Sequence, residues 1–219
     1  MINHKSLKPI MSSDLICIEG AIGAGKSSFA KRLAIDLKAN LFLEKFEENS
    51  FLPKFYANKD RYAFALEMSF LADRYHQIQQ FEQFDDEKIT ISDYYITKSR
   101  VFASVNLCGN EAELFDTVYK IMFRKVWKPR LLVYLYRPVK QLISNIELRG
   151  RPYESKVEPA YLNELQTRYL EFIETQKDEL TILILDIGDR DFIRDEKCYR
   201  SMLETIGKRR LKGLYRETI

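Results

Sequence analysis

A chain of 219 residues is long enough to form one domain with a sizeable hydrophobic core. Hydrophobic residues make up 46% of the chain and charged residues 31%, which excludes a disordered or fibrous protein. The formal net charge of +3 gives no electrostatic case for a nucleic-acid partner, although it leaves room for a local phosphate site.

Apolar runs, the first residues and the cysteines of the sequence predict the cellular compartment of the protein. No apolar run is long enough to cross a membrane, and the first residues lack the hydrophobic centre of a secretion signal. Residues 1–13 are predicted to be a polar, flexible leader before a single domain at 14–219. The three cysteines lie far apart without the spacing of a metal site, which is typical of reduced thiols. We therefore expect a cytoplasmic protein without a membrane partner.

A phosphate-binding motif follows the first predicted strand, at 15–18, and precedes a predicted helix at 28–38. The motif reads Gly20-Ala21-Ile22-Gly23-Ala24-Gly25-Lys26-Ser27, which fits G-x-x-x-x-G-K-[ST]. Backbone N–H groups of the loop and the N-terminus of the helix would hold phosphate oxygens. Lys26 would reach the terminal phosphates, and Ser27 would offer a hydroxyl to Mg²⁺. We expect the loop residues, together with Ser28, to bind ATP.

Single carboxylates end the next two predicted strands. Glu44 follows a short apolar strand at 41–43, and Asp93 follows another at 89–92. Between them lie a segment in which Pro53 starts a helix and a long aromatic-rich helix from 61 to about 84. Because ligands bind at the carboxyl ends of parallel strands, both carboxylates are expected at the same edge of the sheet.

Helices and strands continue to alternate to residue 186, which predicts an α/β fold with a parallel sheet flanked by helices. The predicted elements are helices at 95–107 and 111–126, a strand at 130–136, a helix at 138–149, a helix at 159–177 and a strand at 180–186. With the first three strands this makes a five-stranded sheet. The tail from 189 to 219 is charged and partly helical, and its Lys208-Arg209-Arg210 cluster is typical of a solvated helix end.

The surroundings of the loop separate the classes of phosphate-loop proteins. A regulatory GTPase needs N-K-x-D, whereas the nearest string, 58–61, has Arg61 in the last position and lies between helices. A mechanical ATPase would have adjacent acids at the end of one strand. Glu44 and Asp93 on separate strands suit phosphoryl transfer to a small alcohol, because one carboxylate can take the hydroxyl proton while the other orients Mg²⁺.

A basic segment at 149–154 is a candidate lid. Arg149 and Arg151 flank Gly150, so their guanidinium groups could close over the transferring phosphate and stabilise its charge. The alternative is an ordinary basic loop.

From about 15 to 186 the chain resembles the deoxyribonucleoside kinases, the group that includes deoxyguanosine, deoxyadenosine and deoxycytidine kinases. The matching pieces, in order, are the phosphate loop, Glu44, Phe51-Leu52-Pro53-Lys54-Phe55-Tyr56, Tyr62-Ala63-Phe64-Ala65-Leu66-Glu67, Asp93 and Arg149-x-Arg151-x-x-Glu154. The resemblance implies a three-layer fold around a five-stranded parallel sheet, and a homodimer built from helix–helix contacts.

The resemblance also implies roles for particular residues. Glu44 resembles the base near the nucleoside 5′-hydroxyl, Asp93 the acid of a Glu/Asp-Arg-Ser motif, and Tyr56 and Glu154 the pair that holds the sugar 3′-hydroxyl. The chain departs from the motif after the acid, where Tyr94 and Tyr95 replace its Arg and Ser. The missing phosphate contact is expected from one of four arginines, with the lid pair favoured: Arg100, Arg137, Arg149 and Arg151.

Glu67, Arg74 and Ser99 fall at the positions that read the base in the family, and the arginine and serine resemble its purine-specific branch. An ionised Glu67 can only accept hydrogen bonds, so it suits the N1–H and 2-amino donors of guanine, while Arg74 could donate to O6 or N7. A protonated Glu67, which burial would promote, suits N1 of adenine instead. In a further alternative, Glu67 pairs with Arg74 and does not touch the base.

These observations predict an ATP- and Mg²⁺-dependent kinase acting on the 5′-hydroxyl of a purine 2′-deoxyribonucleoside, with deoxyguanosine ahead of deoxyadenosine. The catalytic residues would be Lys26, Glu44, Asp93, Arg149 and Arg151, and Ser27 and Asp93 would hold the metal. One alternative is a nucleoside monophosphate kinase of the thymidylate type, which needs an arginine near the incoming phosphate. Another is a nucleotide-binding regulator without turnover.

Overall fold

The computed structural model describes residues 15–79, 88–124 and 128–219, so the predicted leader lies outside the described residues. Six strands form one sheet: β1 (Leu15–Glu19), β2 (Asn40–Phe42), β3 (Thr90–Ser92), β4 (Leu131–Tyr136), β5 (Thr181–Asp186) and β6 (Gly213–Thr218). Every pairing is parallel, in the order β2-β3-β1-β4-β5-β6. The chain order reverses direction around β1, and this switch point is where open α/β sheets bind ligands.

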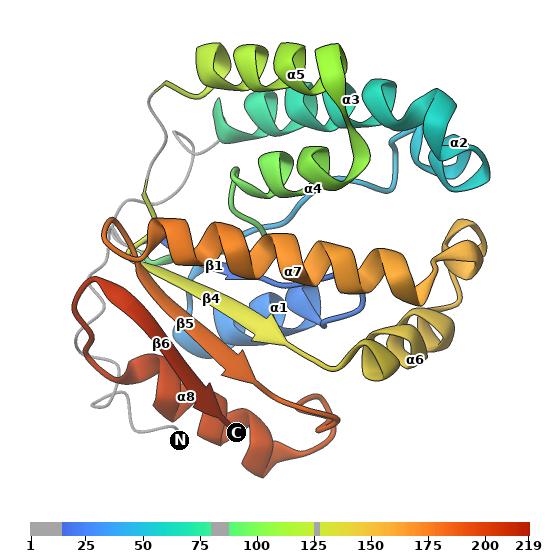
Figure 1. The fold of residues 1–219 in the computed structure, drawn as a ribbon. Coiled ribbons are helices and arrows are strands. Elements are labelled where there is room, and N and C mark those ends of the chain that lie inside the picture. Colours follow the sequence, from blue (N-terminus) through green and yellow to red (C-terminus); the bar gives the residue numbers. More distant parts are fainter. Residues whose placement is uncertain (1–14, 80–87, 125–127) are drawn as a thin grey trace.

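The helices connect the parallel strands and cover both faces of the sheet (Figure 1). They are α1 (Lys26–Leu37), α2 (Leu52–Ala57), α3 (Lys59–Gln79), α4 (Lys98–Asn106), α5 (Gly109–Met122), α6 (Val139–Arg149), α7 (Pro159–Gln176) and α8 (Glu196–Gly207), with a short 3₁₀ helix, η3 (Pro152–Lys156). No helix within these ranges is long and apolar enough to cross a membrane.

Alternating side chains of the strands bury two separate cores, one on each face of the sheet. Ile16 and Ile18 of β1 point into the first core, which they share with α1, α6 and α8, while Cys17 between them points into the second. The second core is built by α2, α3, α4, α5 and α7 and is rich in aromatic rings. Three layers result, as the sequence predicts, with the phosphate loop between them at the end of β1.

The prediction of five strands is wrong by one, because the tail adds β6 at the edge of the sheet beside β5 (Figure 1). Its charged side chains give β6 no apolar run by which the sequence would predict a strand. In the fold they are neutralised in pairs: Arg216 donates to Asp186 at 2.8 Å, and Glu217 accepts from Lys208 at 2.6 Å. An edge strand with one face toward solvent tolerates such charges, which also protect it from pairing with other chains.

The other predicted elements are confirmed with small shifts of their ends. The segment around Pro53 forms only the two-turn helix α2. Helix α3 is described to residue 79, so its predicted end near 84 lies outside the described residues. Helix α5 ends at Met122 with Phe123 as its C-cap, so the predicted end at 126 is wrong. Pro138 lies just before α6 as its N-cap, where its missing N–H costs no helical hydrogen bond.

Candidate active site

The phosphate loop takes a shape that only glycine permits at two points. Gly23 has φ +84°, and a Cβ there would lie 2.5 Å from the carbonyl oxygen of Leu142 in α6. Gly25 has φ +93° and precedes α1, and a Cβ there would lie 2.9 Å from the ring of Phe192. The loop is therefore packed between α6 and the segment before α8, with the N-terminus of α1 exposed to an incoming anion.

Lys26 turns back onto the loop. Its Nζ donates to the carbonyl oxygens of Gly20 and Ala21, both at 2.9 Å. Burial, and then the charge of Lys98, lower its pKa to about 8, against the opposing effect of nearby carboxylates. An anion placed in the loop would restore its preference for the charged form, since a negative charge beside an ammonium raises the pKa.

Glu44 lies just beyond β2 and is held by two cations. Arg74 of α3 donates to Oε1 through Nε at 2.9 Å and Nη2 at 2.5 Å, and Lys98 of α4 donates to Oε2 at 2.5 Å. Burial alone would raise the pKa of Glu44, but the charges and hydrogen bonds of Lys98 and Arg74 outweigh it and lower the pKa to about 2. The carboxylate is therefore ionised and fixed in orientation.

Asp93 joins the end of β3 to both the phosphate loop and Glu44. Ser27 donates from Oγ to Asp93 Oδ2, and the backbone N–H of Glu44 donates to Oδ1 at 2.8 Å. Burial and the charge of Glu44 raise the pKa of Asp93, a shift that a bound cation would oppose. Magnesium in phosphate-loop enzymes takes a hydroxyl and a carboxylate from the protein and its other ligands from phosphate and water. Ser27 and Asp93 fit that donor set.

One cavity of about 300 Å³ brings most of the predicted residues together, and its volume is typical of a small-molecule site. Its lining combines phosphate-loop residues, the carboxylates Glu44 and Asp93, and aromatic rings such as those of Phe70 and Phe102. The predicted site residues that line it are Gly23, Gly25, Lys26, Ser27, Ser28, Glu44, Tyr56, Arg74, Asp93, Arg149, Arg151 and Glu154, with Ile22 of the loop. Gly20, Ala21 and Ala24 support the loop from behind, and both alanines are fully buried.

Two of the predicted base-reading residues, Glu67 and Ser99, are buried and do not line this cavity. Ser99 accepts from Arg74 Nη1 at 2.7 Å, so it helps to aim Arg74 at Glu44. The predicted alternative in which Glu67 pairs with Arg74 is wrong, because Glu44 on a neighbouring strand takes that guanidinium. Glu67 instead accepts from Asn106 Nδ2 at 2.7 Å.

The second carboxylate oxygen of Glu67, Oε2, is buried without a hydrogen-bond partner among the described residues. Burial raises the pKa of Glu67 to about 7, against the opposing hydrogen bond from Asn106 and the charge of Arg74. Glu67 lies one helical turn from Phe70, which lines the cavity. A carboxyl group with an unpaired oxygen is thus held directly behind the wall of the site.

The segment predicted as a lid contributes three residues to the lining of the cavity, Arg149, Arg151 and Glu154. Gly150 ends α6 in the left-handed conformation, and η3 follows. Arg149 donates to Glu154 Oε2 through Nε at 3.0 Å, and Arg151 pairs with Glu47 at 2.9 Å. Both guanidinium groups are therefore neutralised within the protein, yet both still line the cavity.

Tyr56 and Glu154 line the same cavity, as expected of a pair that would share one sugar hydroxyl. Burial raises the pKa of Tyr56, so its hydroxyl stays protonated and can donate. The ring of Tyr56 also stacks on Tyr153 of η3, with 6.0 Å between centroids. This contact ties α2 to the lid segment.

The two tyrosines that replace the Arg and Ser of the family motif are buried and do not line the cavity. Tyr94 donates its hydroxyl to Gln77 Oε1 at 3.0 Å. Of the four arginines considered as substitutes, Arg100 pairs with Asp116 at 2.9 Å on the outer side of α4. Arg137 donates to backbone carbonyls, including that of Arg190 at 2.8 Å. Of these four arginines, the two of the lid, Arg149 and Arg151, line the cavity.

Two buried charged residues near the loop were not predicted from the sequence. Lys98 lines the cavity, whereas the sequence predicts that an arginine replaces the missing phosphate contact of the family motif. Glu19 ends β1 and accepts from the backbone N–H of Tyr95 at 2.7 Å and from the hydroxyl of Tyr169 at 3.0 Å. Its place at a strand end, as for Glu44 and Asp93, was a usable signal. Glu19 thus fixes the backbone two residues after Asp93 through its hydrogen bond with Tyr95.

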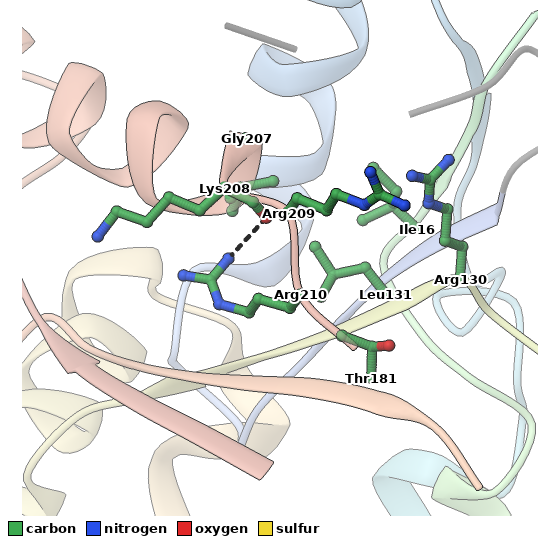
Figure 2. A pocket seen from close by; sticks show the side chains of 9 residues that line it. Ile16, Arg130, Leu131, Thr181, Gly207, Lys208, Arg209 and Arg210 are labelled. Atoms are coloured by element: carbon green, nitrogen blue, oxygen red, sulfur yellow. Dashed lines mark hydrogen bonds between the residues drawn. The ribbon is translucent and has the colours of Figure 1, made fainter. Parts of the chain in front are cut away.

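A smaller hollow of about 60 Å³ lies at the opposite edge of the sheet, lined by Arg130, Lys208, Arg209 and Arg210 among others. Lys208 extends away from Arg209 and Arg130, and Arg210 donates to the carbonyl of Lys208 at 3.2 Å (Figure 2). Lys208 and Arg210 also share Glu217. Lys208 and Arg209 follow the end of α8 and are exposed, as the prediction of a solvated helix end requires. The prediction is wrong for Arg210, whose side chain is only 5% exposed where it pairs with Glu217.

A phosphate loop at the switch point of a parallel sheet, with a hydroxyl and two carboxylates beside it, defines a phosphotransferase of the phosphate-loop class. A family model described as deoxynucleoside kinase matches residues 16–211. The chain therefore belongs to the deoxynucleoside kinase family and is a phosphotransferase.

Individual relatives bear the same family name. The chain is 34% identical over 193 residues to a deoxyguanosine kinase of Bacillus subtilis (strain 168), covering 86% of this chain and 93% of the relative. It is 27% identical over 205 residues to a deoxyadenosine/deoxycytidine kinase of the same organism, covering 90% and 93%. The fold matches a deoxyadenosine kinase from M. mycoides with bound dCTP at a TM-score of 0.75 and 21% identity, covering 88% of this chain and 98% of that one.

Proposed function

We propose that this deoxynucleoside kinase transfers the γ-phosphoryl group of ATP to the 5′-hydroxyl of a purine 2′-deoxyribonucleoside, with deoxyguanosine preferred and deoxyadenosine close behind. The observation that carries the proposal is the shared cavity, which Lys26, Ser27, Glu44 and Tyr56 all line. A nucleoside oriented along it presents its 5′-hydroxyl to Glu44 and its 3′-hydroxyl to Tyr56.

The chemistry assigns a role to each residue. The loop amides and Lys26 bind the triphosphate, and Ser27 and Asp93 hold Mg²⁺, which would neutralise charge on the phosphates. Glu44, held by its two cations, orients the 5′-hydroxyl and takes its proton. Tyr56 and Glu154 hold the 3′-hydroxyl, and Arg149 and Arg151 exchange their carboxylate partners for the transferring phosphate.

The preference for a purine rests on Glu67, Arg74 and Ser99. Rotation of the Glu67 side chain toward the cavity would present a carboxylate to the N1–H and 2-amino donors of guanine. With a pKa of about 7, Glu67 is also protonated in part at neutral pH and can then donate to N1 of adenine. Relatives of this chain carry both names, deoxyguanosine kinase and deoxyadenosine kinase.

The test is a panel of the four deoxynucleosides with Mg-ATP, alongside the four deoxynucleoside monophosphates. We expect deoxyguanosine and deoxyadenosine to be converted to monophosphates with the highest kcat/KM, and the monophosphates to be left unchanged. Preference for a pyrimidine would contradict the base assignment. Turnover of monophosphates alone would favour the thymidylate-type alternative, and tight ATP binding without any turnover would favour a regulator.

We also propose that the enzyme is a homodimer formed through helices, as the family resemblance implies. Leu114 and Ile121 of α5 support this, since they lie two turns apart on one face and are 51% and 58% exposed. Helix α5 is the outermost helix on its side of the sheet (Figure 1). A single domain at 14–219 and a cytoplasmic location remain expectations from the sequence.

A further inference from the structure

Lys98 is a buried cation of the cavity whose task in the proposed function is limited to holding Glu44. It begins α4, is 7% exposed, and lines the cavity together with Glu44 and Lys26. Removing an ammonium group from water is costly unless its partners compensate. The burial of Lys98 therefore requires an anionic partner that compensates for the lost hydration of its ammonium group.

Glu44 is the partner that the structure gives, but Glu44 does not require two cations. Arg74 already donates two hydrogen bonds to Oε1, and Ser99 fixes Arg74 in that orientation. The pair of Glu44 and Arg74 is thus neutral and orientated without Lys98. Two N–H groups of the Lys98 ammonium stay available for another acceptor, because only one is needed for Oε2.

The space beside Lys98 is suited to an anion. Lys98 and Lys26 both line this cavity, so two ammonium groups face one space. Lys26 belongs to the triphosphate site and Lys98 contacts the carboxylate that faces the nucleoside hydroxyl. Lys98 thus shares a cavity with the lysine of the triphosphate site and contacts the proposed base of the acceptor site.

We propose that Lys98 is a second catalytic lysine, which binds the phosphoryl group as it passes from ATP to the nucleoside; this rests on the proposed function of the site. In the transfer, the nucleoside O5′ forms a bond to the γ-phosphorus, and the bond from that phosphorus to the β–γ bridging oxygen breaks. ADP leaves with the electron pair, and the hydroxyl proton passes to Glu44. Glu44 is then neutral, so the ammonium group of Lys98 exchanges it for the phosphate of the product.

Other cations near α4 do not fill this role. Arg100 lies two residues further along the same helix but is directed outward, where it pairs with Asp116. Arg137 is occupied by backbone carbonyls of the phosphate loop and of the segment after β5. Lys98 is the cation of α4 that reaches the cavity in the part of the chain that the structure describes.

The experiment compares two ligands that differ only by a phosphate. Affinities for deoxyguanosine and for its 5′-monophosphate are measured by calorimetry in the wild type, in Lys98→Met, in Lys98→Arg and in the control Arg100→Met. The same pair of ligands with adenine in place of guanine covers the other purine. If Lys98 binds the transferred phosphate, Lys98→Met loses about 10- to 100-fold in affinity for the monophosphate, the cost of one charge-assisted hydrogen bond, and less than about threefold for the nucleoside.

Lys98→Arg should recover most of the affinity for the monophosphate, and Arg100→Met should resemble the wild type. An equal loss for both ligands in Lys98→Met would show that Lys98 only neutralises Glu44, and would overturn the proposal, as would an unchanged affinity for the monophosphate. Failure of the wild type to phosphorylate any purine deoxynucleoside would instead refute the proposed function. Turnover thus tests the proposed function, whereas the ratio of the two affinities tests the role of Lys98.

Discussion

At the scale of single residues, the site keeps two buried carboxyl groups in opposite states. Arg74 and Lys98 keep Glu44 ionised, with a pKa of about 2, whereas burial with a single amide partner raises the pKa of Glu67 to about 7. A carboxylate with so low a pKa is a weak base. It suits a loose phosphoryl-transfer transition state, in which the hydroxyl group passes its proton to the base only late in the reaction.

The raised pKa of Glu67 predicts a pH-dependent cost in stability. Because the folded protein holds the proton of Glu67 more tightly than the unfolded chain, the stability linked to it is present below pH 4.5 and is lost as the pH rises through about 7. Glu67→Gln keeps the shape and cannot ionise. In urea unfolding it should be more stable than wild type by about 3 kcal/mol at pH 8 and nearly equal at pH 4. Equal stability at both pH values would contradict the assignment.

The same titration predicts a change in purine preference. Below pH 7 the protonated Glu67 can donate to N1 of adenine, and above it the carboxylate accepts from N1–H and the 2-amino group of guanine. The ratio of kcat/KM for deoxyguanosine over deoxyadenosine should therefore rise between pH 6 and pH 8. Glu67→Gln should flatten this rise. A ratio that is constant in the wild type would remove Glu67 from base recognition.

At the scale of elements, the phosphate loop depends on its close contact with α6. A methyl group at Gly23 would meet the carbonyl oxygen of Leu142, so Gly23→Ala should displace the loop and weaken ATP binding by about 10- to 100-fold. Gly109→Ala is the matched control, since Gly109 also has a positive φ, +53°, but has nothing within 4 Å of an added Cβ. Calorimetry with Mg-ATP would measure both. Equal affinities of the two variants would show that the strained shape of the loop is not needed.

Pattern and fold agree best where neighbouring residues decide the structure. The loop motif and the strand ends at Glu44 and Asp93 follow from local sequence, because parallel strands bring their carboxyl ends to one edge. Ion pairs between residues that are far apart in the sequence do not follow from local sequence. A pair of Glu67 with Arg74 is one predicted alternative, because carboxylates and arginines commonly satisfy each other, but the end of β2 brings Glu44 to Arg74 instead. The polar strand β6 was missed because its charges are neutralised only in three dimensions.

At the scale of the whole molecule, the exposed apolar face of α5 predicts association between two copies. Leu114→Asp or Ile121→Asp would place a charge in the proposed contact, where a buried unpaired carboxylate is costly. Light scattering after size-exclusion chromatography should show a dimer of about 52 kDa, twice the 25.9 kDa of the chain, for the wild type and a monomer for the variants. A monomeric wild type, or variants that remain dimers, would contradict a dimer through α5.

The whole account depends on Glu44 activating a sugar hydroxyl beside the bound triphosphate. Its most direct test is the single-turnover rate of deoxyguanosine phosphorylation with saturating Mg-ATP in Glu44→Gln, with deoxyguanosine binding measured on the same preparation. The glutamine side chain fills the same space as the glutamate but cannot accept the hydroxyl proton. We predict a rate about 10²- to 10⁴-fold below wild type with nucleoside binding retained. A rate within about threefold of wild type, in a folded protein that binds the nucleoside, would contradict the account.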